Sequence, residues 1–169
     1  VRCLKAMGAK SYMAKVDMLQ AFRQLPVHPD DYPLLEFMWD GNYYFDRCLV
    51  MGASSSCRIF ESPSTAIEWI LVNRLGVSCC VHCLDDFWIC ERTERACQNS
   101  LHKFLCLCAA LGIPIAHKKT MGPAQVLVFL GIELDSIHME LRLPDDKIAK
   151  CKELLLANTK KRKITLCEL

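Results

Sequence analysis

Residues 77–90 have the sequence VSCCVHCLDDFWIC, two apolar runs interrupted only by the acidic pair Asp85-Asp86. Both runs are rich in β-branched, aromatic and cysteine side chains, which is typical of buried strands. Two such runs separated by two residues predict a β-hairpin with both acids at its tip. This hairpin decides the fold class, because directly connected strands of this kind belong in an antiparallel sheet.

A third carboxylate, Asp17, ends another short apolar run that begins at Met13. If this strand neighbours the hairpin, Asp17 and Asp85 meet at one edge of the sheet. Such an edge suits Mg²⁺, which proteins usually hold with one or two carboxylates plus waters and substrate phosphates. Two ions about 3.5 to 4 Å apart stabilise the attacking and leaving oxygens of a phosphoryl transfer. An ordinary solvated turn is the alternative interpretation of Asp85-Asp86, because turns favour aspartate.

The rest of the chain alternates hairpins with helices. Asp40-Gly41 predicts a turn between strands at 34–39 and 42–47, and Asp135-Ser136 predicts another between strands at 125–134 and 138–143. Pro63 should kink or split the first of the predicted helices. Apolar periodicity predicts these helices over residues 56–75, 93–111 and 144–157. This order predicts the α+β class, with an antiparallel sheet covered by helices.

The composition, 52% hydrophobic and 24% charged over 169 residues, predicts a globular chain that needs no disulfides. The net charge of +2 means that any nucleic-acid contact must be local. Most of the twelve cysteines lie in apolar runs, which favours reduced thiols and an intracellular location, cytoplasmic or nuclear. The most apolar stretch, 104–116, contains Gly112 and Pro114 and is too short for a bilayer, so no membrane partner is expected.

Cys80, His82 and Cys83 invite a zinc interpretation. Residues three apart on a strand point to opposite faces, which argues against Cys80 and Cys83 sharing an ion. Buried apolar thiols without zinc are therefore expected.

Both ends of the chain suggest an internal piece of a longer polypeptide. The first residue is Val1, and Thr165 with Glu168 has the spacing of a capping box, where a further helix would begin.

Five motifs occur in the order found in the palm of a reverse transcriptase, and the chain resembles that family over nearly its whole length. The motifs are Lys15-Val16-Asp17 with Ala21-Phe22, Leu49-Val50-Met51-Gly52 running to Ile59-Phe60, Cys83-Leu84-Asp85-Asp86, Gly112-Ile113-Pro114 with Lys119-Thr120, and Phe129-Leu130-Gly131. The strings 14–23 and 26–31 most resemble retroelements of the DIRS type, which carry a tyrosine recombinase. The resemblance implies a palm with a remnant of the fingers at 1–143. Residues 144–169 would start the thumb or connection, with the rest of fingers and thumb truncated.

The resemblance also implies roles for single residues. Asp17, Asp85 and Asp86 match the site of two Mg²⁺ ions, for which Mn²⁺ could substitute, and Lys119 matches a proton donor to the leaving pyrophosphate. Phe22 matches an aromatic gate under the nucleotide sugar, and Met51 and Gly52 match the nucleotide-binding turn. Phe129, Leu130 and Gly131 match the hairpin that grips the primer end. The basic run Lys160, Lys161, Arg162 and Lys163 is placed to contact primer or template phosphates, although a solvated or localisation-like tail explains it equally well.

The implied function is RNA-directed DNA polymerisation, adding deoxynucleoside triphosphates to a primer on an RNA or DNA template. The rest of a polyprotein, with ribonuclease H and tyrosine recombinase parts, would be its partner. Three departures from the family support the alternative of an inactive or co-opted palm that at most binds nucleic acid. Cys83 stands where the family has Tyr, Cys57 where it has Pro, and Met51 where Phe or Gln is common.

Overall fold

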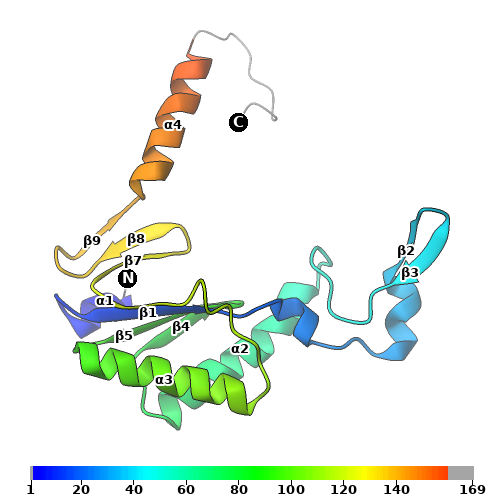
Figure 1. Cartoon of the computed structure of the whole chain (residues 1–169), viewed down its shortest axis with the longest axis horizontal. Coiled ribbons are helices and arrows are strands. Elements are labelled where there is room, and N and C mark those ends of the chain that lie inside the picture. Colours follow the sequence, from blue (N-terminus) through cyan, green and yellow to red (C-terminus); the bar gives the residue numbers. More distant parts are fainter. Residues whose placement is uncertain (1, 160–169) are drawn as a thin grey trace.

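The centre of the computed structural model, which describes residues 2–159, is a four-stranded antiparallel sheet with strand order β4-β5-β1-β6 (Figure 1). Its strands are β1 (Tyr12–Asp17), β4 (Cys80–Cys83), β5 (Asp86–Glu91) and β6 (Met121–Ala124). The predicted hairpin forms β4 and β5, and β1 pairs with β5 along its whole length. The α+β prediction is therefore confirmed.

Two helices, α2 (Ser56–Asn73) and α3 (Glu94–Ala110), cover one face of this sheet (Figure 1). Alternate residues of the strands, such as Val16 and Phe87, enter the core beneath them. Phe87 meets Phe104 of α3 edge to face, with ring centroids 5.0 Å apart, and both rings are fully buried. This core fixes the positions of the two strands that carry the acidic residues.

The other face of the sheet is covered by α1 (Arg2–Met7) and by a separate three-stranded sheet. That second sheet consists of β7 (Val126–Phe129), β8 (Ile132–Asp135) and β9 (Glu140–Arg142). A second apolar cluster lies between the layers and includes Leu4, Met13, Trp88 and Leu127. The odd and even residues of β1 therefore face different layers.

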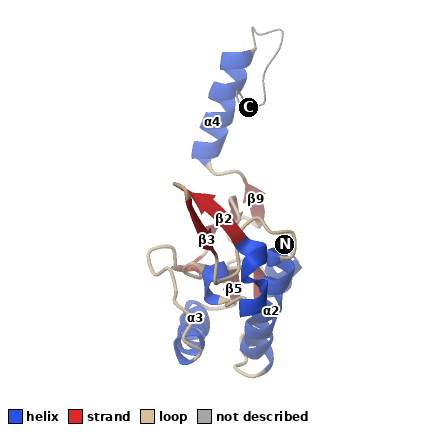
Figure 2. Cartoon of the chain, turned by 90° about the vertical axis from the view of Figure 1, so that its right-hand side faces the viewer, coloured by secondary structure: helices blue, strands red, loops and turns tan. Residues whose placement is uncertain are grey.

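Two segments project from this body. The hairpin of β2 (Glu36–Trp39) and β3 (Asn42–Phe45) extends to one side after two 3₁₀ helices, Ala21–Gln24 and Pro29–Leu35. Helix α4 (Asp145–Asn158) extends away beyond β9 and has no buried residue (Figures 1 and 2). All residues of β2 and β3 are exposed as well. None of the described helices is long and apolar enough to cross a membrane.

Three details differ from the sequence predictions. Helix α2 is not split at Pro63, because buried residues on both sides of the proline, Phe60 and Ile67, hold it on the sheet. Only Asp85 belongs to the β4–β5 turn, whose other residue is Leu84 with φ 56°, and Asp86 is the first residue of β5. The single strand predicted at 125–134 is wrong, because a turn at residues 130–131 separates β7 from β8. The predicted basic run and capping box lie outside the described residues.

Candidate active site

Three aspartates gather at one edge of the central sheet. Asp17 ends β1 and lies directly opposite Asp86, the first residue of β5. Asp85 occupies the adjoining turn, where its carbonyl oxygen accepts a hydrogen bond from the amide of Met18 at 3.2 Å. The predicted convergence of these residues is therefore confirmed at the level of the backbone.

The electrostatics of this edge are unbalanced. Partial burial raises the pKa of the Asp86 carboxyl above its usual value, and the nearby negative charges of Asp85 and Asp17 raise it further. The ammonium groups of Lys119 and Lys15 oppose this shift. A cation at this edge would relieve the repulsion among the three carboxylates.

Lys119 supplies one such cation. Its Nζ donates a hydrogen bond to Asp17 Oδ2 at 2.9 Å, and this contact raises the pKa of the Lys119 ammonium. The loop that carries Lys119 is fixed to the end of β1, since the amide of Ala116 donates to the Asp17 carbonyl at 2.9 Å. The structure thus places Lys119, which the resemblance implies is a proton donor, beside Asp17.

The donor set suits Mg²⁺, because it consists of carboxylate oxygens at an accessible sheet edge. Within residues 2–159, however, no three histidine, cysteine, aspartate or glutamate side chains are placed to hold one metal ion. The Asp17 carboxylate is turned toward Lys119 instead. Two carboxylates with waters and phosphates are enough for Mg²⁺, so the residues fit the ion once Lys119 releases Asp17.

Cys80 is buried and Cys83 is exposed. The two side chains therefore point to opposite faces of β4, as strand alternation predicts.

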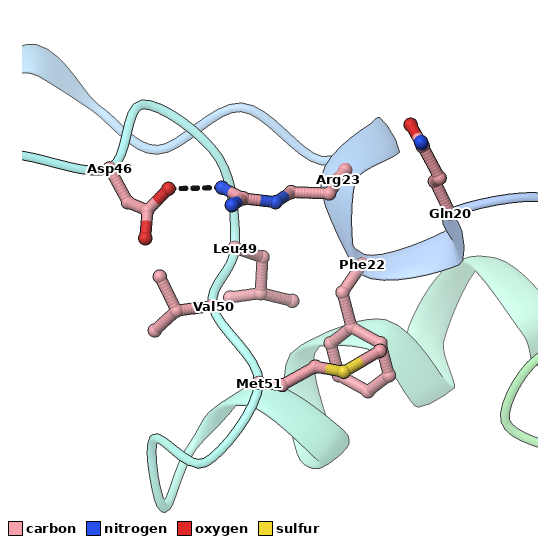
Figure 3. A pocket seen from close by; sticks show the side chains of 7 residues that line it. All are labelled: Gln20, Phe22, Arg23, Asp46, Leu49, Val50 and Met51. Carbon is pink, nitrogen blue, oxygen red and sulfur yellow. Dashed lines mark hydrogen bonds and ion pairs between the residues drawn. The ribbon is translucent and has the colours of Figure 1, made fainter.

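A pocket of about 450 Å³ lies beyond the end of β1 (Figure 3). Phe22 lines it from the first 3₁₀ helix, where its ring also stacks on Phe60 with centroids 5.0 Å apart. Met51 lines the same pocket and is 79% exposed, and Gly52 follows with φ +94°, a conformation that favours glycine. The structure thus brings together two residues that the resemblance assigns to nucleotide binding.

Arg23 and Asp46 form an ion pair across this pocket (Figure 3). The pair connects the first 3₁₀ helix to the segment that follows β3. Neither residue was singled out from the sequence, because a pairing across 23 residues leaves no local pattern.

The predicted primer hairpin, Phe129-Leu130-Gly131, lies where Phe129 ends β7 and Leu130 and Gly131 form the turn to β8. Leu130 and Gly131 both have positive φ, 48° and 76°, as a tight hairpin turn requires. Lys15 Nζ donates to the carbonyl of Val128 at 2.9 Å, so the hairpin is bonded to β1 two residues before Asp17. The sequence motif includes Lys15 but assigns it no role, although a charged residue inside an apolar strand is a signal.

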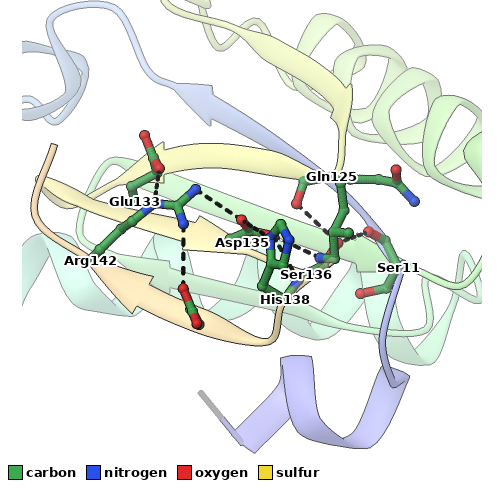
Figure 4. A network of polar contacts seen from close by, with 9 residues as sticks. Ser11, Gln125, Glu133, Asp135, Ser136, His138 and Arg142 are labelled. Carbon is green, nitrogen blue, oxygen red and sulfur yellow. Dashed lines mark hydrogen bonds and ion pairs between the residues drawn. The ribbon is translucent and has the colours of Figure 1, made fainter. Parts of the chain in front are cut away.

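A second acidic site lies on β8, where Asp135 is 1% exposed (Figure 4). Its carboxylate accepts hydrogen bonds from the amides of Ile137 and His138 at 2.8 and 3.0 Å. It also accepts from Arg142 Nη2 at 2.9 Å and lies 2.8 Å from His138 Nδ1. The hydrogen bonds from the amide and ring of His138, followed by that from the Ile137 amide, hold the pKa of Asp135 far below its usual value. Ser136 then joins the layers, its hydroxyl donating to the Ser11 carbonyl at 2.6 Å.

No family model matches the chain. Among curated proteins, Protein P of heron hepatitis B virus is 28% identical over 127 residues, which covers 75% of this chain and 16% of that protein. Protein P of duck hepatitis B virus (strain Germany/DHBV-3) is 29% identical over 128 residues, with the same coverage. The chain thus spans about one sixth of the length of these relatives.

Solved structures show the fold. The foamy viral protease-reverse transcriptase in complex with an RNA/DNA hybrid matches with a TM-score of 0.74 and 20% identity, over 85% of this chain and 18% of that one. Its complex with double-stranded DNA matches with a TM-score of 0.69 and 20% identity, over 89% of this chain and 33% of that one. The native prototype foamy virus protein covers 98% of this chain at a TM-score of 0.69, with 17% identity and 23% of that chain. The chain therefore has a reverse-transcriptase-like fold.

Proposed function

We propose that this chain is the catalytic palm of an RNA-directed DNA polymerase. The observation that carries the proposal is the convergence of Asp17, Asp85 and Asp86 at the sheet edge, beside Lys119. The likeness to foamy viral protease-reverse transcriptase supports it, because the same fold there is seen with an RNA/DNA hybrid and with double-stranded DNA. The partners we propose are an RNA or DNA template with its primer, and deoxynucleoside triphosphates.

Asp17 and Asp85 would hold Mg²⁺, and Asp86 would adjust the charge beside it. Two bound ions would stabilise the attacking and leaving oxygens of the phosphoryl transfer, and Mn²⁺ is a reasonable substitute. Asp86 stays less acidic than an ordinary aspartate because it is partly buried among like charges. Lys119 keeps its proton at Nζ while bonded to Asp17. Once released from Asp17, Nζ can donate that proton to the leaving pyrophosphate.

The remaining predicted residues act by position. The Phe22 ring, fixed by its stack on Phe60, would lie under the sugar of the incoming nucleotide and leave no space for a 2′-hydroxyl. Met51 and Gly52 would border the nucleotide on the exposed side of the pocket. The turn at 129–131 would hold the primer end, and the basic run 160–163 would contact phosphates.

We further propose the finer assignments that the sequence suggests. The source would be a retroelement of the DIRS type, with ribonuclease H and recombinase parts elsewhere in a polyprotein. Residues 1–143 would be the palm with part of the fingers, and α4 would begin the thumb, which agrees with its extension away from the body. The cysteines in apolar runs of the sequence are the basis for proposing an intracellular location, cytoplasmic or nuclear.

A palm that binds nucleic acid without catalysis is the second candidate. The observation that favours it is the Asp17–Lys119 ion pair, which occupies a carboxylate that a metal ion would need. Cys83 beside the acidic turn is exposed, as is Cys57 on α2, and both replace residues that the family uses.

Primer extension separates the two candidates. The assay uses the longest protein that contains these residues and can be expressed. This protein is given an RNA template, a DNA primer, deoxynucleotides and Mg²⁺. Extension by the wild type that is lost in Asp85→Asn supports the polymerase. Template binding without extension in either protein supports the second candidate.

A further inference from the structure

Lys15 is the charged residue in the middle of β1, opposite Trp88 of β5 and Met121 of β6. Side chains two apart on a strand share a face, so Lys15 lies on the same face as Asp17. Between them, Val16 points into the helix-covered core. Lys15 therefore faces the layer formed by β7, β8 and β9.

The half-buried Lys15 ammonium connects the central sheet to the sheet of β7, β8 and β9. Its Nζ donates to the main-chain carbonyl of Val128 at 2.9 Å, a contact between residues 113 apart in the chain. A charged donor makes a stronger hydrogen bond than a neutral one, and a half-buried ammonium without a partner would be costly. The contact thus fixes β7 against the strand that ends in Asp17.

A second lysine forms a hydrogen bond to the β7–β8 turn from its other side. Lys147, in the first turn of α4, donates from Nζ to the carbonyl of Gly131 at 3.1 Å. Gly131 has a φ of +76°, which favours glycine, and a Cβ there would meet only the flexible end of the Lys147 side chain. The turn is therefore held at both ends, by Lys15 on the sheet side and by Lys147 on the helix side.

We propose that Lys15 is a positioning residue that sets the distance between the primer-holding turn and the aspartate edge. The inference rests on the proposed polymerase function and deepens it, since it names the residue that couples the two parts of the site. Reacting atoms must be held about 3 to 3.5 Å apart for transfer, and small displacements are costly to the rate. A looser turn would misplace the primer 3′-hydroxyl while leaving the nucleotide pocket unchanged.

The test compares Lys15→Met, Lys15→Arg and wild type, with Lys5→Met as the matched control. Lys5 is an exposed lysine of α1, so the control makes the same chemical change at a surface position. Amide hydrogen exchange over residues 126–132 measures how firmly the turn is held. Steady-state primer extension gives separate KM values for primer-template and for deoxynucleotide.

We expect Lys15→Met to speed exchange in this turn, to lower kcat for extension roughly tenfold and to raise the primer-template KM, with the deoxynucleotide KM nearly unchanged. Lys15→Arg should bring the exchange rate and the kinetic constants back close to their wild-type values, because arginine keeps a charged donor. Unchanged exchange in Lys15→Met, or behaviour equal to that of Lys5→Met, would overturn the inference. A change confined to Mg²⁺ dependence would also overturn it, because that result assigns Lys15 a purely electrostatic effect on Asp86. If the wild type extends no primer, the proposed function fails, and this inference fails with it. The exchange data would then report only on the Lys15 contact.

Discussion

The aspartate edge at the end of β1 and Asp135, whose neighbour Ser136 bonds to Ser11 just before β1 begins, have opposite surroundings. Asp135 is buried, and hydrogen bonds from the amide and ring of His138, and then from the amide of Ile137, lower its pKa. Asp86 shares its edge with two other carboxylates, and its pKa is raised. Asp135 therefore has its charge compensated inside the protein, whereas the aspartate edge has more negative charge than its lysines neutralise.

The difference separates an acid that supports structure from acids that await a ligand. A buried carboxylate with several donors stabilises the fold in its charged form. Carboxylates that repel one another cost stability, and such arrangements are concentrated at functional sites. The same residue type therefore predicts opposite responses to substitution at the two sites.

The largest expected effect is on catalysis. Asp85→Asn should lower the rate of Mg²⁺-dependent primer extension by about a thousandfold or more, the scale expected when a group that stabilises developing charge is removed. The thermal midpoint should stay the same or rise, because one of three repelling charges disappears. Parallel extension assays and thermal unfolding check this, and a large loss of stability would contradict the contrast between the two sites.

Lys119→Met should have the next largest effect, lowering the extension rate by roughly a hundredfold, since a positioned proton donor contributes on that order. Folding should change little, because the Lys119 side chain is 68% exposed. Lys118→Met, the same change at the neighbouring exposed lysine, is the control. Equal extension rates in the two variants would show that Lys119 is not the proton donor.

Asp135→Asn should reverse this pattern. The amide keeps an acceptor for the backbone of Ile137 and His138 but loses the charge that Arg142 contacts. We expect the thermal midpoint to fall by several degrees, and the aspartate edge to keep its Mg²⁺ response at temperatures where the variant is folded. Calorimetric unfolding measures the first part, and an unchanged midpoint would show that Asp135 is not structural.

The smallest expected effect is a pH dependence of the difference in unfolding free energy between wild type and Asp135→Asn. Because the pKa of Asp135 is lowered in the folded chain, the unfolded chain binds more protons between the two pKa values, and stability there rises with pH. The contribution of Asp135 is complete above its unfolded pKa of about 3.9 and is lost as the pH falls through the folded value. The gap in unfolding free energy between wild type and Asp135→Asn should therefore narrow below about pH 4. A constant gap would contradict this assignment.

The sequence predicted the aspartate edge better than the Asp135 site, for physical reasons. Asp17, Asp85 and Asp86 end or begin apolar runs, so strand pairing alone brings them together. Asp135 and Ser136 look like an ordinary turn in the sequence, because the partners of Ser136, Ser11 and Gln125, lie 125 and 11 residues away and nothing local shows that Asp135 is buried. Contacts of this kind leave no periodic signal.

Turn chemistry accounts for most of the errors in the fold. The β4–β5 turn places Leu84 at positive φ, which sequence rules reserve for glycine or asparagine, so the pairing of Cys83 with Asp86 overrides local preference. The turn at Leu130-Gly131 is hidden inside a continuous apolar run. No role for Lys15 could be predicted, because its partner is a backbone carbonyl, which any residue at position 128 would provide.

The most direct test of the central claim is paramagnetic broadening by Mn²⁺, followed residue by residue in the NMR spectrum. We expect Mn²⁺ to broaden the amide signals of residues 17, 85 and 86 at low concentration and Mg²⁺ to reverse the broadening. The signals of residues 135–138 should stay sharp. Asp17→Asn should weaken the effect. Equal broadening at both sites, or none at the aspartate edge, would contradict the claim that this edge is the metal centre of a polymerase.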